Sequence, residues 1–177
     1  MKCIYYLTPT LDSTKKITDD LHQAGIDDWF IHVLSHNEAV LKKEKIHSSN
    51  YLEQLDLLRF GIFGVISGFI VGLIATGLVN TTELLGPDIP NIAYFAIILF
   101  FTLFGSWVGG LTGVATENNK TTLFHDDLES GSYLIIIYTK RAAEGALKEV
   151  METKHPEAKL AAIDANFYNP LTSLKRI

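Results

Sequence analysis

The residues best suited to bind a metal or transfer a proton are six histidines and several pairs of adjacent acids. His32 and His36 are close in sequence, and His125 and Asp126 follow the second of two long apolar segments. Imidazole and carboxylate groups suit zinc, iron or manganese, so these four residues could meet in a metal site. Their spacing matches no compact metal motif, and surface hydrogen bonding, helix capping or a half-buried strand position explains them more simply. We keep them as weak candidate ligands and expect no cofactor.

No catalytic motif accompanies these residues. The chain lacks a Gly-x-Ser-x-Gly elbow, a phosphate-binding P-loop and a Gly-x-Gly-x-x-Gly turn after a strand. Adjacent acids such as Asp126 and Asp127 fit an acidic surface or a helix cap better than acid–base catalysis. Cys3 is the only cysteine, so no intramolecular disulfide can form, and on a strand it is expected to be a small buried hydrophobe. The sequence therefore indicates a protein that is not an enzyme.

Charge is strongly segregated along the chain. Residues 60–79 and 92–115 carry no charged side chain, whereas the flanking segments are rich in Lys, Asp and Glu. A helix needs about 20 apolar residues to cross a hydrocarbon core. We therefore predict two transmembrane helices, at about 51–79 and 92–115, joined by an extracytoplasmic loop at 80–91. No secretory signal opens the chain, so the first span is expected to be internal.

The basic residues predict the orientation of this hairpin. Seven Lys or Arg residues precede it and eight follow it, whereas the loop has none but carries Glu83 and Asp88. Cytoplasmic flanks of membrane helices are enriched in Lys and Arg, so both termini are expected in the cytoplasm. The net charge of −5 argues against a nucleic-acid partner. The expected partners are the lipid bilayer, further copies of the chain and another membrane protein.

The flanking segments each predict a strand, a helix and a strand. Two β-α-β units form a ferredoxin-like split sheet, here interrupted by the hairpin between the second and third strands. The predicted cytoplasmic halves are 1–49 and 117–177, on either side of a membrane segment at 50–116. A sheet swapped between protomers is also possible. The predicted strands are Lys2–Leu7, Trp29–Leu34, Ser132–Thr139 and Leu160–Phe167, and the predicted helices are about 14–24, Asn37–Ile46 and Arg141–Lys154.

Two helix starts carry capping signals. Asp12 or Ser13 is expected to cap the first helix. Asn50 followed by Glu53 predicts a capping box, in which each residue bonds the backbone of the other. From this box an apolar stripe leads into the first span, so a continuous helix of about 43 Å over 51–79 is predicted.

Glycines recur at every fourth position in both spans, which places them on one face of each helix. Such faces allow close backbone approach, a main source of helix association in lipid. The grooves could pack on each other within one hairpin, hold several copies together, or line a pore. Gly61, Gly77 and Gly110 lie off these faces and could serve a second interface. The predicted packing residues are Gly64, Gly68 and Gly72 in the first helix and Gly105, Gly109 and Gly113 in the second.

These two glycine series, together with Leu128-Glu129-Ser130-Gly131 before the strand Tyr133–Tyr138, carry a family resemblance. Over residues 1–167 the chain resembles a group of uncharacterised bacterial membrane proteins with a glycine-zipper hairpin between two α/β halves, related to general stress protein 17M-like domains. The resemblance implies a location in the bacterial inner membrane. It supplies no reaction and no catalytic residues.

Our leading hypothesis is a non-enzymatic, homo-oligomeric inner-membrane protein with a ferredoxin-like cytoplasmic domain that scaffolds, regulates or senses a small ligand. One alternative is a small channel lined by the glycines with Thr102 and Ser106. Another is a metal-binding membrane sensor that uses His32, His36 and His125.

Overall fold

The computed structural model describes residues 2–82, 85, 86, 88–140, 143–167, 169 and 172–177. It divides into two compact units. We call Met1–Gln54 with Asn119–Ile177 the sheet domain, and Leu55–Asn118 the hairpin. Glu83 of the predicted loop and Arg141, where a helix was predicted to begin, lie outside the described residues.

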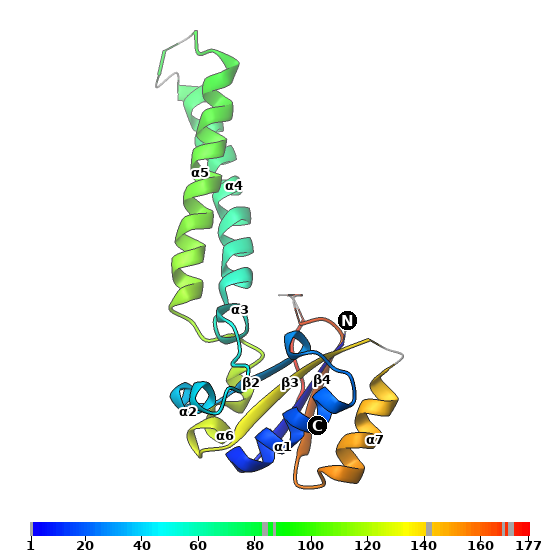
Figure 1. The fold of residues 1–177 in the computed structure, drawn as a ribbon. Coiled ribbons are helices and arrows are strands. Elements are labelled where there is room, and N and C mark those ends of the chain that lie inside the picture. Colours follow the sequence, from blue (N-terminus) through cyan, green and yellow to red (C-terminus); the bar gives the residue numbers. More distant parts are fainter. Residues whose placement is uncertain (1, 83–84, 87, 141–142, 168, 170–171) are drawn as a thin grey trace. The chain divides into compact units, whose positions relative to one another are not determined.

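The sheet domain is built on four antiparallel strands in the spatial order β2-β3-β1-β4 (Figure 1). The central strand β1 pairs with β3 along its whole length. The predicted mixed α+β class is therefore confirmed. The strands are β1 (Lys2–Thr8), β2 (Ile31–Leu34), β3 (Tyr133–Thr139) and β4 (Lys159–Asp164).

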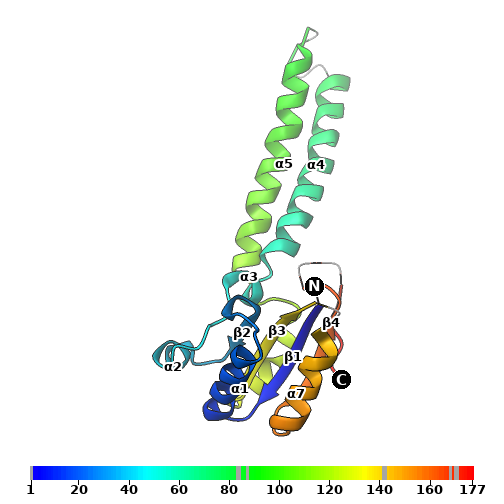
Figure 2. The same cartoon turned by 45° about the vertical axis from the view of Figure 1, so that its right-hand side comes forward.

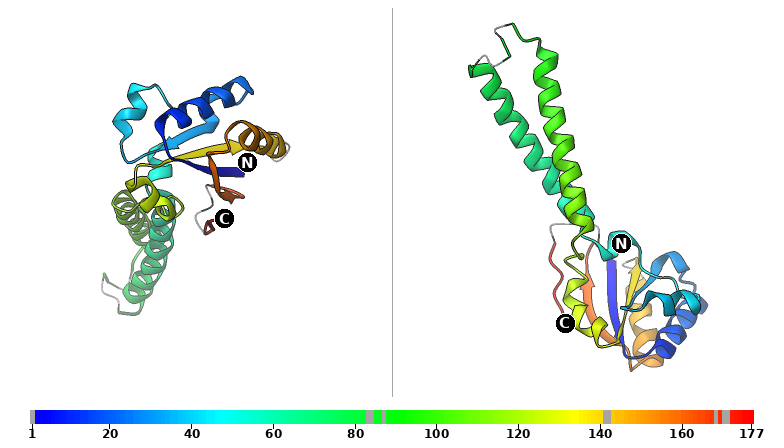
Figure 3. Two further views of the ribbon diagram at one scale, coloured as in Figure 1. Left: turned by 90° about the horizontal axis from the view of Figure 1, so that it is seen from below. Right: turned by 90° about the vertical axis from the view of Figure 1, so that its left-hand side faces the viewer.

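Two helices, α1 (Leu11–Gln23) and α7 (Glu144–Lys154), cover one face of this sheet (Figure 3, right). Their buried side chains, such as Ile17, Leu21 and Met151, pack on strand residues that include Ile4 and Ile137. Removal of these apolar groups from water is the main stabilising term of this layer.

The opposite face, which we call the second face, is covered by shorter segments. These are η2 (Thr122–Phe124), α6 (His125–Glu129) and the C-terminal residues, of which Phe124, Phe167 and Leu174 are buried. The chain end also pairs with β4, since the Ile177 amide donates to the Ala161 carbonyl at 2.8 Å. Because both faces are covered, β3 is apolar along nearly its whole length.

Several predicted boundaries need correction. Thr10, not Asp12 or Ser13, caps α1: its hydroxyl accepts a hydrogen bond from the Ser13 amide at 3.2 Å, which fixes the helix start three residues earlier. The second strand begins at Ile31 because Asp28–Phe30 forms a 3-10 turn, η1. β4 ends at Asp164, whereas the prediction continued to Phe167. The second helix is also shorter than predicted, α2 being Glu38–Lys43.

The prediction of one continuous helix over 51–79 is wrong. This segment forms two helices, a short α3 (Tyr51–Gln54) in the sheet domain and a long α4 (Leu57–Thr82) in the hairpin. The two helices are separated because Leu55 pairs with Glu117 and the Asp56 amide donates to the Thr116 carbonyl at 3.0 Å. These backbone groups are therefore not used to continue the helix.

The predicted capping box is confirmed at the start of α3. The Asn50 side chain accepts from the Glu53 amide at 3.1 Å, and the Glu53 carboxylate accepts from the Asn50 amide at 3.0 Å.

The hairpin consists of α4 and α5 (Asn91–Val114), which lie side by side along their length (Figure 2). Both are long and apolar enough to cross a membrane. At 1.5 Å per residue their 26 and 24 residues correspond to about 39 and 36 Å. Most large side chains of both helices are exposed, whereas Gly64, Gly68, Gly72, Gly109 and Gly113 are buried.

Candidate functional site

Ionisable side chains gather on the second face of the sheet, almost completely removed from solvent. The register places Cys3 between Tyr138 on β3 and Asp164 on β4. Tyr5 and His32 lie opposite the same residue of β3, from its two sides. Residues two apart on a strand point to the same face, so these side chains share one surface. Each of the five is less than a tenth exposed.

Glu53 is completely buried and accepts hydrogen bonds from three groups. His32 Nδ1 lies 2.6 Å from Glu53 Oε1, the Tyr138 hydroxyl donates to the same oxygen, and the Asn50 amide donates to Oε2. A buried carboxylate is costly unless donors surround it. These donors explain how Glu53 can be buried, and they attach α3 to β2 and β3.

A buried ion pair joins Lys120 to β4. Lys120 Nζ donates to Asp164 Oδ2 at 2.6 Å and to the carbonyls of Asn166 and Phe167 at 2.9 and 2.8 Å. The Phe167 ring centroid lies 5.4 Å from the ammonium nitrogen, which adds a cation–π contact. The three hydrogen bonds satisfy the whole donor capacity of the ammonium group.

The Glu53 hydrogen bonds and the Lys120 ion pair form two buried polar clusters, which lie where the chain leaves and re-enters the sheet domain. Glu53 precedes Leu55, the first hairpin residue, by two positions, and Lys120 follows Asn118, the last, by two. Thr121 Oγ1 donates to the Glu53 carbonyl at 3.3 Å. Both connecting segments are therefore held on the sheet by buried charged side chains and are hydrogen-bonded to each other.

Cys3 lies between these two polar clusters but is not a nucleophile. Burial, reinforced by the negative charges of Glu53 and Asp164, raises the pKa of its thiol far above the ordinary value. Burial likewise raises the pKa of the Tyr5 phenol. Because the thiolate is the reactive form of cysteine, Cys3 stays protonated and inert at neutral pH. Cys3 is completely buried, as predicted.

A row of aromatic rings runs from this buried site to the surface. The His32 ring centroid lies 5.4 Å from that of Tyr138 and 4.9 Å from that of His47, and the His47 centroid lies 6.2 Å from that of Trp29. Trp29 is 78 % exposed. Among the described residues, the buried Nε2 of His32 has no hydrogen-bond partner. The row links the Glu53 site to an exposed aromatic side chain.

The weak metal candidates from the sequence are not brought together. His32 bonds Glu53, whereas His36 and Asp126 are exposed. His125 Nε2 lies 3.2 Å from Glu129 on its own helix. In the part of the chain that the structure describes, no group of three or more His, Cys, Asp or Glu residues is arranged to hold a metal ion.

The six predicted packing glycines all lie where α4 meets α5. A methyl group on Gly64 would lie 2.2 Å from the Gly105 carbonyl oxygen, and one on Gly68 would lie 2.3 Å from the Phe101 carbonyl oxygen. Equivalent groups on Gly72, Gly105, Gly109 and Gly113 would also come within 3 Å of backbone atoms of the other helix. The two grooves thus close on each other within one chain, and a pore between these faces of one hairpin has no room.

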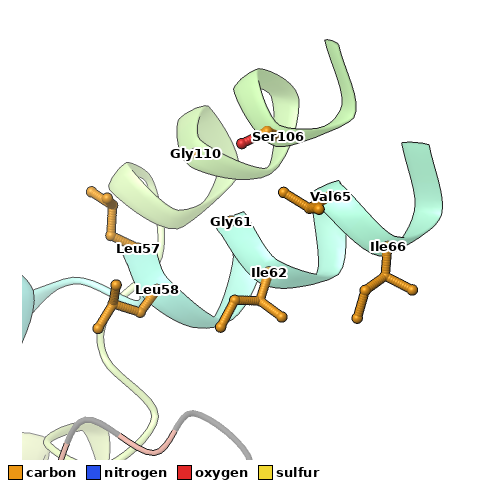
Figure 4. A pocket seen from close by; sticks show the side chains of 8 residues that line it. All are labelled: Leu57, Leu58, Gly61, Ile62, Val65, Ile66, Ser106 and Gly110. Carbon is orange, nitrogen blue, oxygen red and sulfur yellow. The ribbon is translucent and has the colours of Figure 1, made fainter. Parts of the chain in front are cut away.

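Three glycines off this interface face open space. No atom lies within 4 Å of the position that a side-chain carbon would take on Gly61, Gly77 or Gly110. Gly61 and Gly110 line a groove of about 360 Å³ on the hairpin, shown in Figure 4. The groove is otherwise apolar except for Ser106; its remaining lining residues are Leu57, Leu58, Ile62, Val65 and Ile66.

Comparison with known proteins gives no match: no protein-family model fits the chain, and no curated protein or solved structure is significantly similar to it. The family resemblance suggested by the glycine series therefore remains a prediction.

Sequence analysis missed most of the buried site. It identified Glu53 only as a capping residue and gave no role to Tyr138, Lys120 or Asp164. One local signal was present, because Cys3, Tyr138 and Asp164 each place a polar group in an otherwise apolar strand. Strands with both faces buried rarely carry such groups without partners.

Proposed function

We propose that this protein is a non-enzymatic, two-span membrane protein whose sheet domain is a cytoplasmic regulatory module, with a scaffolding or ligand-sensing role. The observation that carries this proposal is a pair of buried polar clusters, namely the hydrogen bonds of Glu53 and the ion pair of Lys120 with Asp164. They hold both segments that connect the sheet domain to the hairpin. A flexible tether would need no buried charges at these points. A change of state in the domain could therefore reach α4 and α5 through the chain.

Membrane insertion is supported by the outer surface of the hairpin. Side chains such as Ile66, Phe69, Leu73, Phe100 and Leu103 are between 47 and 61 % exposed. Soluble monomers rarely expose apolar surface on this scale. In a bilayer the same surface is in its preferred solvent, and all backbone groups of a helix are satisfied internally. The basic flanks and the loop without Lys or Arg support cytoplasmic termini, and the family resemblance supports a location in the inner membrane.

A ferredoxin-like arrangement of the domain is supported by its topology. The order β2-β3-β1-β4, with α1 and α7 on one face, is the one expected for two β-α-β units that share a split sheet.

Self-association is the second part of the proposal, and the groove of Gly61, Ser106 and Gly110 is its most suitable surface. The glycine series themselves are already occupied within the chain. The hydroxyls of Ser67 and Thr102 bond carbonyls of their own helices, whereas that of Ser106 has no hydrogen-bond partner in the described residues. A helix of a second copy could supply one, which an acyl chain cannot.

The regulatory role is tested by hydrogen exchange of the full-length protein in lipid nanodiscs. Glu53→Gln should accelerate exchange in the first turns of α4, because the carboxylate can no longer pair with His32 as an anion. Glu144→Gln is the matched control, since it alters an ion pair of α7 with Lys2. If Glu53→Gln changes exchange in the sheet domain but leaves α4 and α5 like the wild type, regulation through the connecting segments is wrong.

Topology and subunit number are tested separately. In a Cys3→Ser background, Asp88→Cys should react with an impermeant thiol reagent from outside intact cells, and Lys175→Cys only after permeabilisation. Gly110→Leu should lower the oligomer mass seen by native mass spectrometry, whereas Gly77→Leu, which is equally open but outside the groove, should not. Equal masses for both variants would refute self-association through the groove.

A further inference from the structure

The sheet domain exposes large apolar side chains in two short helices, η1 before β2 in the sequence and α3 after it. Trp29 is 78 % and Phe30 36 % exposed in η1, just before the strand, and Tyr51 is 78 % and Leu52 36 % exposed in α3. Most of the other large apolar side chains of this domain are buried in the two core clusters. An exposed Trp–Phe pair and an exposed Tyr–Leu pair therefore need an explanation.

These side chains are presented by ordered structure. The Trp29 ring packs near His47, the His47 ring packs on His32, and His32 bonds Glu53 in α3. The segment that carries His47 is itself paired with β2, since the Val33 amide donates to the His47 carbonyl at 3.0 Å. The two exposed pairs thus belong to one connected part of the domain, fixed by buried contacts behind it.

Chain length limits how far Tyr51 and Leu52 can lie from the membrane. Leu52 is five residues before Leu57, where α4 begins. Five extended residues span at most about 18 Å. The chain therefore keeps α3 within about that distance of the first residue of α4. If α4 enters the bilayer, as the proposed function requires, this tether allows α3 to reach the headgroup region, which is about 5–7 Å thick on each side.

We propose that Trp29, Phe30, Tyr51 and Leu52 form an interfacial patch that inserts into the headgroup region of the bilayer that holds the hairpin. Tryptophan and tyrosine combine a large apolar ring with a polar group and are enriched at this depth in membrane proteins. This inference rests on the proposed membrane insertion, and it adds that the sheet domain itself contacts lipid.

The charged residues near the patch predict which lipid headgroups the patch prefers. Asp27 and Asp28 immediately precede Trp29, and Glu53 is buried and hydrogen-bonded beneath α3. Carboxylates beside the ring gain nothing from anionic headgroups. The patch should therefore insert into vesicles of zwitterionic phosphatidylcholine without needing anionic lipid.

The two tryptophans of the chain make a direct test possible, because one lies in the patch and the other, Trp107, lies in α5. Full-length Trp107→Phe and Trp29→Phe variants are reconstituted in phosphatidylcholine brominated either near the headgroup or deep in the acyl chains. Trp29 should be quenched more strongly by the shallow bromines. Trp107 should be quenched by the deep ones, since it lies about 7 Å along the helix from the middle of α5.

The outcomes separate the two proposals. Quenching of Trp107 without any quenching of Trp29 refutes the patch and leaves membrane insertion intact. Absence of quenching at both refutes membrane insertion and the patch with it. If neither brominated lipid nor aqueous iodide quenches Trp29, protein covers this side chain. That result also refutes the patch.

Second variants test whether the patch inserts as a unit. In the Trp107→Phe background, Leu52→Asp should abolish quenching of Trp29 by the shallow bromines, because a carboxylate resists transfer to the interface. Leu123→Asp is the matched control, since Leu123 is 43 % exposed in η2, outside the patch. Circular dichroism of each variant verifies that the domain is folded. Equal Trp29 quenching in both variants would show that Trp29 does not depend on α3.

Discussion

Replacing Gly109 by alanine tests the close approach of α4 and α5 at one of its two tightest points. The added methyl carbon would lie 2.2 Å from the Phe60 carbonyl oxygen and 3.1 Å from Gly64 Cα. Ordinary contact begins near 3.4 Å, so the backbones must separate locally by about 3.4 − 2.2 = 1.2 Å. A gap of ~0.5–1 Å already removes a quarter to a half of the dispersion energy of each contact. The neighbouring glycine contacts would weaken together.

The expected loss is about 1–3 kcal/mol, the usual cost of an overpacked interface. This corresponds to roughly a 5- to 150-fold fall in the folding equilibrium constant of the hairpin. Gly77 provides the matched control, because nothing lies within 4 Å of its missing side chain and it lies outside the groove of Gly61, Ser106 and Gly110. Alanine there should be neutral or stabilising by up to about 1 kcal/mol, from its better helix propensity.

The assay is unfolding in mixed micelles with increasing dodecyl sulfate, followed by Trp107 fluorescence in a Trp29→Phe background and by circular dichroism. Gly109→Ala should unfold at a lower dodecyl sulfate fraction, whereas Gly77→Ala should not. If Gly109→Ala and Gly77→Ala shift the midpoint equally, the backbones do not approach closely at Gly109 and the glycine faces do not pair as described.

Other predictions concern the sheet domain. Lys120→Met should destabilise it by about 3–5 kcal/mol in denaturant unfolding, because Asp164 is left buried without its cation; adding Asp164→Leu should recover part of the loss. The Cys3 thiol should resist labelling at pH 8 until denaturant is added. Because the pKa of this thiol is raised in the folded protein, its contribution to stability should be present below about pH 9 and fall as pH rises above that value. The Ser13 hydroxyl lowers the pKa of Glu157, so stability from this bond should be present above about pH 4.5 and be lost as pH falls through the folded pKa. Ser13→Ala should make acid unfolding less steep.

Features with short sequence periods were predictable. Glycine spacing of four residues indicated the faces on which α4 and α5 meet, because helix geometry alone decides which residues share a face. The strand predicted at Ser132–Thr139 was recognisable because its apolar run is continuous, and β3 lies within it. The capping box at Asn50 and Glu53 was recognisable because its hydrogen bonds join residues three apart.

The buried site was not predictable by the same means, because its partners are distant in sequence. Glu53 bonds Tyr138 across 85 residues, and Lys120 bonds Asp164 across 44. Taken alone, the segments that carry Glu53 and Lys120 have the composition of solvent-exposed segments. Only the assembled sheet removes these two side chains from water. The break after Gln54 escaped prediction for the same reason, since it depends on the pairing of residues 55–56 with 116–117.

The position of the hairpin in the chain explains why the sheet domain tolerates so large an insertion. It lies in the connection between β2 and β3, which are antiparallel hydrogen-bonded neighbours, with Leu34 opposite Leu134. Such neighbours can be joined by a very short turn, so the ends of an insertion can stay close together. The hairpin meets this condition by itself, because the Asp56 amide donates to the Thr116 carbonyl at its base. An insertion with separated ends would strain the sheet. With closed ends, the sheet needs only local fixation of the connecting segments, which Glu53 and Lys120 provide.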